Sequence, residues 1–202
     1  MNNFLAVDTS SRYLTVCARN GEKTAVRHIP QCAMKHSVIL MEEIDKALTE
    51  IDLAPSSCDF FAAVTGPGSF TGIRIGIAVA KGFAAAAQKP LVSVTSFDLI
   101  AYNVEDENFL VVIDAARSHY YTCAYGRGRQ IIGVPAYLSE NDVKSLGLPM
   151  YGFEDLPFEN YRKINAGDCL YKAVLSCRER ADGNMRALYV RKSQAEEARG
   201  EA

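Results

Sequence analysis

Short apolar runs alternate with turn-forming residues over the first thirty positions of the chain. The runs with strand character cover residues 4–7, 13–18 and 23–29. Asn20-Gly21, between the second and third runs, is a strong signal for a two-residue hairpin. We therefore predict a β-meander of three strands at the start of the chain.

The apolar period changes between residues 33 and 51. Apolar side chains recur there every three or four residues, which indicates one face of a helix; they are Met34, Val38, Met41, Ile44, Leu48 and Ile51. Ile39 and Leu40 widen this stripe beyond what a single core contact needs. The pattern then predicts a buried strand over 59–64, an alanine-rich helix over 73–88, a strand over 91–94 and a short helix over 96–102.

The second half of the chain repeats this order after a polar, acidic segment at residues 104–108. The apolar run 109–114 ends in Asp114, as the run 4–8 ends in Asp8. Two further strands, a short helix capped by Ser139, a strand at 149–152 and a helix over 168–180 follow. The order βββαβα thus occurs twice, which predicts an internal duplication with lobes at residues 1–104 and 105–202.

A meander continued by αβα and present twice is typical of the two-lobed actin/Hsp70-like α/β fold (ASKHA, RNase H-like). In such folds nucleotide lies between the lobes, with its phosphates held by the Asp-bearing hairpins. Because one fold hosts many functions, the element order alone does not establish nucleotide binding.

Composition narrows the function classes. The 202 residues carry a formal net charge of −2, whereas a protein that binds nucleic acid unaided usually has a basic excess on one face. None of the six cysteines has the spacing of a zinc site, so we predict buried thiols. The sequence shows neither a signal-peptide core nor an apolar stretch near the ~20 residues of a membrane span, so we expect a cytoplasmic protein without membrane contact.

Two turns, one polar and one rich in glycine, are candidates for a phosphate- or anion-binding site. Asp8-Thr-Ser-Ser11 stands where this fold places its first phosphate-binding turn, and its hydroxyls could hold phosphate. The alternative is a hairpin turn in which Asp and Ser satisfy local backbone groups. The loop from Gly66 leads into a helix that Ser69 or Thr71 could cap, and its free N–H groups could form an anion site. The candidate anion contacts are Asp8, Ser10, Gly68 and Ser69.

Small residues follow this loop at helical spacing. Gly72, Gly76, Ala80 and Ala84 lie four apart, on one face of the predicted helix. Small side chains at that spacing allow another helix to approach closely. The spacing predicts a tight helix–helix contact, either within the chain or with a second one.

The glycine segment also carries a family resemblance. Thr65-Gly-Pro-Gly-Ser-Phe-Thr-Gly-Ile-Arg-Ile-Gly76, followed by Ala80-Lys-Gly-Phe-Ala84, closely resembles the TsaB (YeaZ) proteins of bacteria. Further matches are Asp8-Thr-Ser10, Lys35-His-Ser37, Ile113-Asp-Ala115 and, near the end, Leu188-Tyr-Val-Arg191. The resemblance covers the whole chain and is densest over residues 1–115.

The resemblance implies a role in forming N6-threonylcarbamoyladenosine at position 37 of tRNAs that read ANN codons. TsaB-like proteins are the non-catalytic partner of the related transferase TsaD, and a small ATPase, TsaE, joins them. The first two helices of the N-terminal lobe form the interface with TsaD or with a second TsaB. The resemblance therefore implies heterodimers or homodimers, indirect contact with tRNA, and ATP or ADP only in the complex.

The residues themselves do not favour catalysis by this chain. TsaD-like proteins carry two metal-binding histidines after the strand that follows the glycine helix, and Ser96 and Ile100 fall at those positions here. The three histidines, His28, His36 and His119, are scattered without ligand spacing. We predict no metal site, no cofactor in the isolated chain and no catalytic residue.

The predicted interface gathers the apolar and small residues of the two helices. Its members are Met34, His36, Ser37, Leu40, Met41, Ile44, Gly72, Ile73, Gly76, Ile77 and Ala80. Leu40 is expected to be an exposed apolar residue, and His36 a cap, a surface residue or an interface contact. We expect Gly76→Arg or Ile73→Glu to block complex formation while the monomer stays folded.

Two other function classes stay open at this point. One is an actin-fold ATPase or small-molecule kinase active on its own, which tight ATP binding by the lone chain would favour. The other is a homodimeric scaffold that uses the same helices without a TsaD-like partner.

Overall fold

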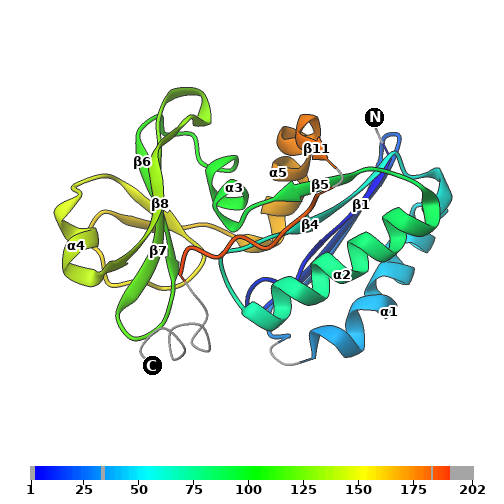
Figure 1. The fold of residues 1–202 in the computed structure, drawn as a ribbon, viewed down its shortest axis with the longest axis horizontal. Coiled ribbons are helices and arrows are strands. Elements are labelled where there is room, and N and C mark those ends of the chain that lie inside the picture. The colour runs from blue at the N-terminus through cyan, green and yellow to red at the C-terminus, as the bar shows by residue number, and fades with distance from the viewer. Residues whose placement is uncertain (1–2, 33–34, 183, 192–202) are drawn as a thin grey trace.

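The structure, a computed structural model, describes residues 3–32, 35–182 and 184–191 and shows two lobes side by side (Figure 1). The first half of the chain supplies β1 (Phe4–Asp8), β2 (Leu14–Asn20), β3 (Lys23–Ile29), α1 (His36–Glu50), β4 (Phe60–Val64), α2 (Phe70–Ala87), β5 (Leu91–Val94) and α3 (Ser96–Ala101). The second half supplies β6 (Phe109–Asp114), β7 (His119–Tyr125), β8 (Ile131–Ser139), α4 (Glu140–Ser145), β9 (Met150–Gly152), β10 (Tyr161–Lys163), α5 (Cys169–Cys177) and β11 (Ala181–Asp182).

The two halves follow the predicted order βββαβα, and the second differs by one additional strand, β10. The sheets run β11-β5-β4-β1-β2-β3 and β10-β9-β6-β7-β8. In each sheet a three-stranded antiparallel meander is continued by parallel strands, β4 and β5 in the first and β9 and β10 in the second. This is the actin-like two-lobed architecture.

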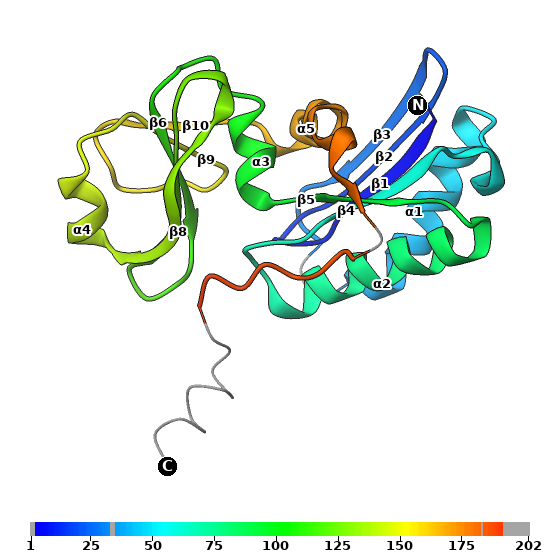
Figure 2. The same ribbon diagram turned by 45° about the horizontal axis from the view of Figure 1, so that its top comes forward.

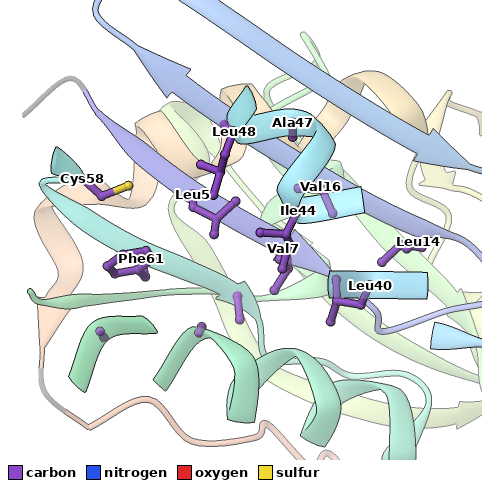
Figure 3. Close-up of a cluster of buried hydrophobic side chains, with 14 of the residues drawn as sticks. Leu5, Val7, Leu14, Val16, Leu40, Ile44, Ala47, Leu48, Cys58 and Phe61 are labelled. Atoms are coloured by element: carbon purple, nitrogen blue, oxygen red, sulfur yellow. The ribbon is translucent and has the colours of Figure 1, made fainter. Parts of the chain in front are cut away.

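Helices cover both faces of the first sheet, as Figures 1 and 2 show. Side chains of β1 alternate between the faces: Leu5 and Val7 belong to the core under α1 and α2, and Phe4 and Ala6 to the core that includes α5. In Figure 3, Leu5 lies beside Leu48 and Val7 beside Ile44, both of α1. Because β4 is covered on both faces, all five of its residues are buried.

The last helix and strand return to the first lobe. Leu170, Ala173 and Val174 of α5 pack in one core with Phe4 and Phe60, and β11 pairs antiparallel with β5. The predicted assignment of all residues after 104 to a second lobe is therefore wrong for 169–182. The physical reason is the apolar face of α5, which covers the otherwise open face of the first sheet.

Two predictions from composition can be compared with the structure. All six cysteines are buried and free, as predicted, and burial raises the pKa of Cys17 and Cys169 to about 12. One helix in the described part of the chain, α2, has the length and apolar composition of a membrane span. It lies along the first sheet with Ile73 and Ile77 in the core.

Candidate functional site

The glycine loop closes directly onto the turn between β1 and β2. The Asp8 Oδ1 atom accepts hydrogen bonds from the backbone N–H of Ser10 (2.9 Å) and from its hydroxyl (2.7 Å). The backbone N–H of Ser69 donates to the Ser10 carbonyl oxygen at 2.7 Å. A Cβ at Gly68, where φ is +157°, would lie 2.2 Å from that same oxygen. The four candidate anion contacts are brought together: Asp8 and Ser69 both hydrogen-bond Ser10, and Gly68 packs against the Ser10 carbonyl group.

Burial changes what Asp8 can do. Its side chain is 1% exposed, and removal from water raises the pKa of the carboxyl although the Ser10 hydrogen bonds act in the opposite direction. With one oxygen already bonded to Ser10, the carboxylate closes a turn. This geometry favours the local-turn interpretation of Asp8-Thr-Ser-Ser11 over the phosphate-binding one.

The predicted small-residue stripe of α2 faces the chain's own sheet. A Cβ at Gly72 would lie 2.0 Å from the Thr9 carbonyl oxygen, and one at Gly76 would lie 2.6 Å from Thr9 Oγ1. The Thr9 hydroxyl also donates to the Gly72 carbonyl oxygen at 2.7 Å. The prediction that a second helix packs closely against these glycines is therefore wrong. The residue that packs against them is Thr9, which directly follows β1.

The buried face of α1 likewise differs from expectation. Leu40 is 1% exposed and packs in the core with Ile44, so it is not an exposed apolar residue. His36 is buried, and its Nε2 lies 3.0 Å from the carbonyl oxygen of Tyr13, so the imidazole connects α1 to the residue that precedes β2. Met34 lies outside the described residues.

The two substitutions chosen from the sequence would damage the monomer. Ile73 is 1% exposed, and Gly76 has no room for a side chain beside Thr9. Ile77 and Ala80 are buried in the same core. Charge or bulk at Ile73 or Gly76 would disrupt the packing of α2 on the sheet, so the expectation of a folded monomer is wrong.

A different face of the same two helices is exposed. On α1, Ser37 is exposed, Val38 is 77% exposed and Met41 is 52% exposed. On α2 the outer positions carry small residues, and a Cβ at Gly82 would have no atom within 4 Å; the exposed small residues are Thr71, Ala78, Gly82, Ala85 and Ala86. We call Val38, Met41 and these α2 residues the outer helix face. Figure 2 shows α1 and α2 adjacent on one side of the sheet.

Spacing alone could not identify the outer helix face. Because α2 carries small residues on more than one face, positions 71, 78, 82 and 85 lie at helical spacing just as 72, 76, 80 and 84 do. A signal was present in the width of the apolar stripe on α1: with Ile39 and Leu40 included, it covers a wider arc than one contact with the sheet can bury, so part of it, here Val38 and Met41, is left exposed.

A segment near the end of the chain, residues 187–191, holds the two lobes together and was missed as a functional element. The Leu188 N–H donates to the Thr65 carbonyl oxygen at 2.7 Å. The Tyr189 ring lies 5.4 Å from the Phe70 ring, and Arg74 Nε donates to the Tyr189 hydroxyl at 3.1 Å. Arg191 Nη1 donates to the Tyr137 hydroxyl on β8 at 2.7 Å. We call this segment the strap; it is red in Figures 1 and 2.

The positions aligned with the metal ligands of the catalytic relative have structural roles here. The Ser96 N–H donates to the Gly66 carbonyl oxygen at 2.8 Å, and Ile100 is fully buried in the core between the lobes. Over residues 3–32, 35–182 and 184–191 no three His, Cys, Asp or Glu side chains are grouped for a metal ion. His28 Nδ1 lies 2.8 Å from the Thr15 hydroxyl, a contact within the meander.

Comparisons with known proteins agree with this architecture. The family model described as "TsaD: tRNA N6-adenosine threonylcarbamoyltransferase" matches residues 27–150. The chain is 32% identical to the tRNA threonylcarbamoyladenosine biosynthesis protein TsaB of Bacillus subtilis over 123 residues, which are 60% of this chain and 54% of that protein. It is 31% identical to TsaB of Escherichia coli over 127 residues, 61% of this chain and 54% of that one.

These matches reach little more than half the length of the two curated relatives. Among solved structures, YeaZ from Pseudomonas aeruginosa superposes with a TM-score of 0.77 at 23% identity, covering 94% of this chain and all of that one. That likeness extends the shared fold over both lobes.

Proposed function

Because this chain belongs to the TsaB (YeaZ) family, we propose that it is the non-catalytic partner of a TsaD-like transferase. The complex would form N6-threonylcarbamoyladenosine at position 37 of tRNAs that read ANN codons. A TsaE-like ATPase would join through the complex, and tRNA would be contacted indirectly. We further propose a cytoplasmic location and nucleotide binding only in the complex.

The outer helix face is the observation that carries this proposal. Val38 and Met41 leave an apolar surface in water beside small α2 residues that allow a helix to approach closely. Exposed apolar side chains grouped on adjacent helices mark protein contact sites. A helix pair from the TsaD-like protein, or from a second copy, would cover this face.

The non-catalytic role is supported by the polar turns. Asp8 is buried and bonded to Ser10, and the glycine loop amide of Ser69 is bonded to the same turn. Burial also raises the pKa of the Cys58 and Cys123 thiols to about 11, which keeps both protonated and weakly nucleophilic at neutral pH.

Arginine substitutions on the outer helix face test the proposal. We expect Ala78→Arg and Gly82→Arg to lower the affinity for the TsaD-like partner about tenfold or more, because a long charged side chain separates the helices. Both positions are exposed, so the monomer should stay folded, with an unfolding midpoint no lower than that of the wild type. The matched control is Ser176→Arg, an exposed position of α5 on the other side of the sheet.

Binding would be measured by titrating the purified TsaD-like protein and by co-purification. Full-affinity binding by both arginine variants would contradict the proposed face. Absence of binding by the wild-type chain would contradict the proposed function itself. ATP turnover by the lone chain would instead support the ATPase interpretation.

A further inference from the structure

A groove lies next to the outer helix face, at the C-terminal half of α1. Its volume is about 530 Å³, and Met41 contributes to both the groove and the face. Leu48 and Leu53 form an apolar floor, together with Phe83 of α2, whose ring stacks on Phe61 at 5.6 Å. This stack fixes the floor before anything binds.

The mouth of the groove is acidic. Asp45 and Asp52 line it, both are exposed, and neither has an ion-pair partner in the described part of the chain. The nearby ammonium group of Lys46 is already paired with Glu42 at 2.7 Å and Glu43 at 2.8 Å. The carbonyl end of α1 adds partial negative charge, and its last turn holds no basic residue.

We propose that this groove receives an arginine or lysine side chain projecting from the partner's helix. The aliphatic stem of such a side chain matches the apolar floor, and its cationic head would meet the carboxylates of Asp45 and Asp52. Continuity through Met41 means that a helix lying on the outer helix face would reach the groove with one side chain. This inference rests on the proposed function and names the partner chemistry at its interface.

Neutral, isosteric substitutions test the groove without altering its shape. Asp52 has a φ of +53°, a conformation that Asn adopts readily, so Asp52→Asn should leave the backbone unchanged. Affinity for the TsaD-like partner would be measured for Asp45→Asn, Asp52→Asn and the double variant at low and at high salt. Asp155→Asn, an exposed acid of the second lobe, is the control.

We expect the double variant to bind about tenfold more weakly at low salt and to lose most of the salt dependence of the wild type. Unchanged affinity and unchanged salt dependence would overturn the inference. An effect on self-association alone, measured by sedimentation of the isolated chain, would overturn it as well.

The binding measurements distinguish an error in the inference about the groove from an error in the proposed function. If Gly82→Arg weakens the complex while the double Asn variant does not, the interface stands and the groove is not part of it. If wild-type protein does not bind a TsaD-like partner at all, the proposed function fails.

Discussion

At the scale of single residues, Asp8 shows how burial changes the hydrogen bonding and the pKa of a carboxyl group. An Asp-Thr-Ser turn can bind a phosphate or hydrogen-bond its own residues. In this chain the Ser10 N–H and hydroxyl both donate hydrogen bonds to one oxygen of the Asp8 carboxyl group. Folding removes the carboxyl from water, which raises its pKa from the ordinary value of 3.8. The folded protein therefore holds this proton more tightly than the unfolded chain does.

The pH dependence of stability follows from that difference. Below a pH of about 3.8, the pKa of Asp8 in the unfolded chain, the carboxyl is protonated in both the folded and the unfolded protein. As pH rises towards the higher pKa of the folded protein, the unfolded chain releases the proton first. The free energy of unfolding therefore decreases over this pH range. We expect Asp8→Asn, which keeps an acceptor for Ser10, to remove this contribution. The difference in free energy of unfolding, variant minus wild type, should increase from pH 4 to pH 7.

Urea unfolding at a series of pH values would measure this difference. A difference that stays constant over the range, or that falls as pH rises, would contradict the assigned burial of Asp8. Asp155→Asn, at an exposed position, serves as the control for a general charge effect.

At the scale of elements, α2 has two small-residue faces with different purposes. The inner face at Gly72 and Gly76 lets the helix contact Thr9 at the end of β1. The outer face at Ala78 and Gly82 is open to solvent in this chain. One helix thus serves the internal packing of the first lobe and, in our proposal, the contact with a partner.

Substitution of Gly72 and of Gly82 by alanine distinguishes the buried inner face of α2 from its exposed outer face. Gly72→Ala should lower the free energy of unfolding by about 1–3 kcal/mol or more, because its Cβ would meet the Thr9 carbonyl oxygen. Gly82→Ala should raise it by about 0.5–1 kcal/mol, because alanine restricts the unfolded chain and nothing obstructs its methyl group.

Urea unfolding of the two variants side by side measures both effects. Equal stability of Gly72→Ala and Gly82→Ala would contradict the assigned orientation of α2. Since both changes add the same methyl group to the same helix, each variant is the control for the other.

At the scale of the whole molecule, the lobes are connected by more than the chain between α3 and β6. The helix α5 and strand β11 return to the first sheet, and the strap then runs from the glycine loop to β8 of the second lobe. The strap is fixed at the first lobe by Phe70 and Tyr189 and at the second by Tyr137 and Arg191. It therefore restrains the angle between the lobes.

A double-mutant cycle measures the first of these contacts. We expect Phe70→Leu and Tyr189→Leu to show a coupling of about 0.5–1.5 kcal/mol in unfolding experiments, the usual range for a packed aromatic pair. The control pair is Phe70→Leu with Tyr161→Leu, which combines α2 with a tyrosine that packs in the core of the second lobe away from the strap, and these two substitutions should be additive. Additivity of the Phe70 and Tyr189 substitutions would show that the strap is not held by this contact.

The sequence by itself determined the order of the elements except for the short strands β10 and β11, and it determined the duplication and the family. Period-two and period-3.6 apolar patterns depend on local geometry, so β5 is found at the predicted residues and α1 and α2 lie within a few residues of their predicted bounds. The glycine segment was likewise readable as a family feature without any knowledge of its contacts.

Only the tertiary structure decided which face of each helix is buried and what the polar turns bind. Helical spacing defines a stripe but not the neighbour that covers it. The sequence therefore predicts Leu40, Gly72 and Gly76 at a partner interface, whereas they pack within the chain. The return of residues 169–182 to the first sheet was equally hidden, because long-range pairing depends on which apolar surface is left uncovered after both halves have folded.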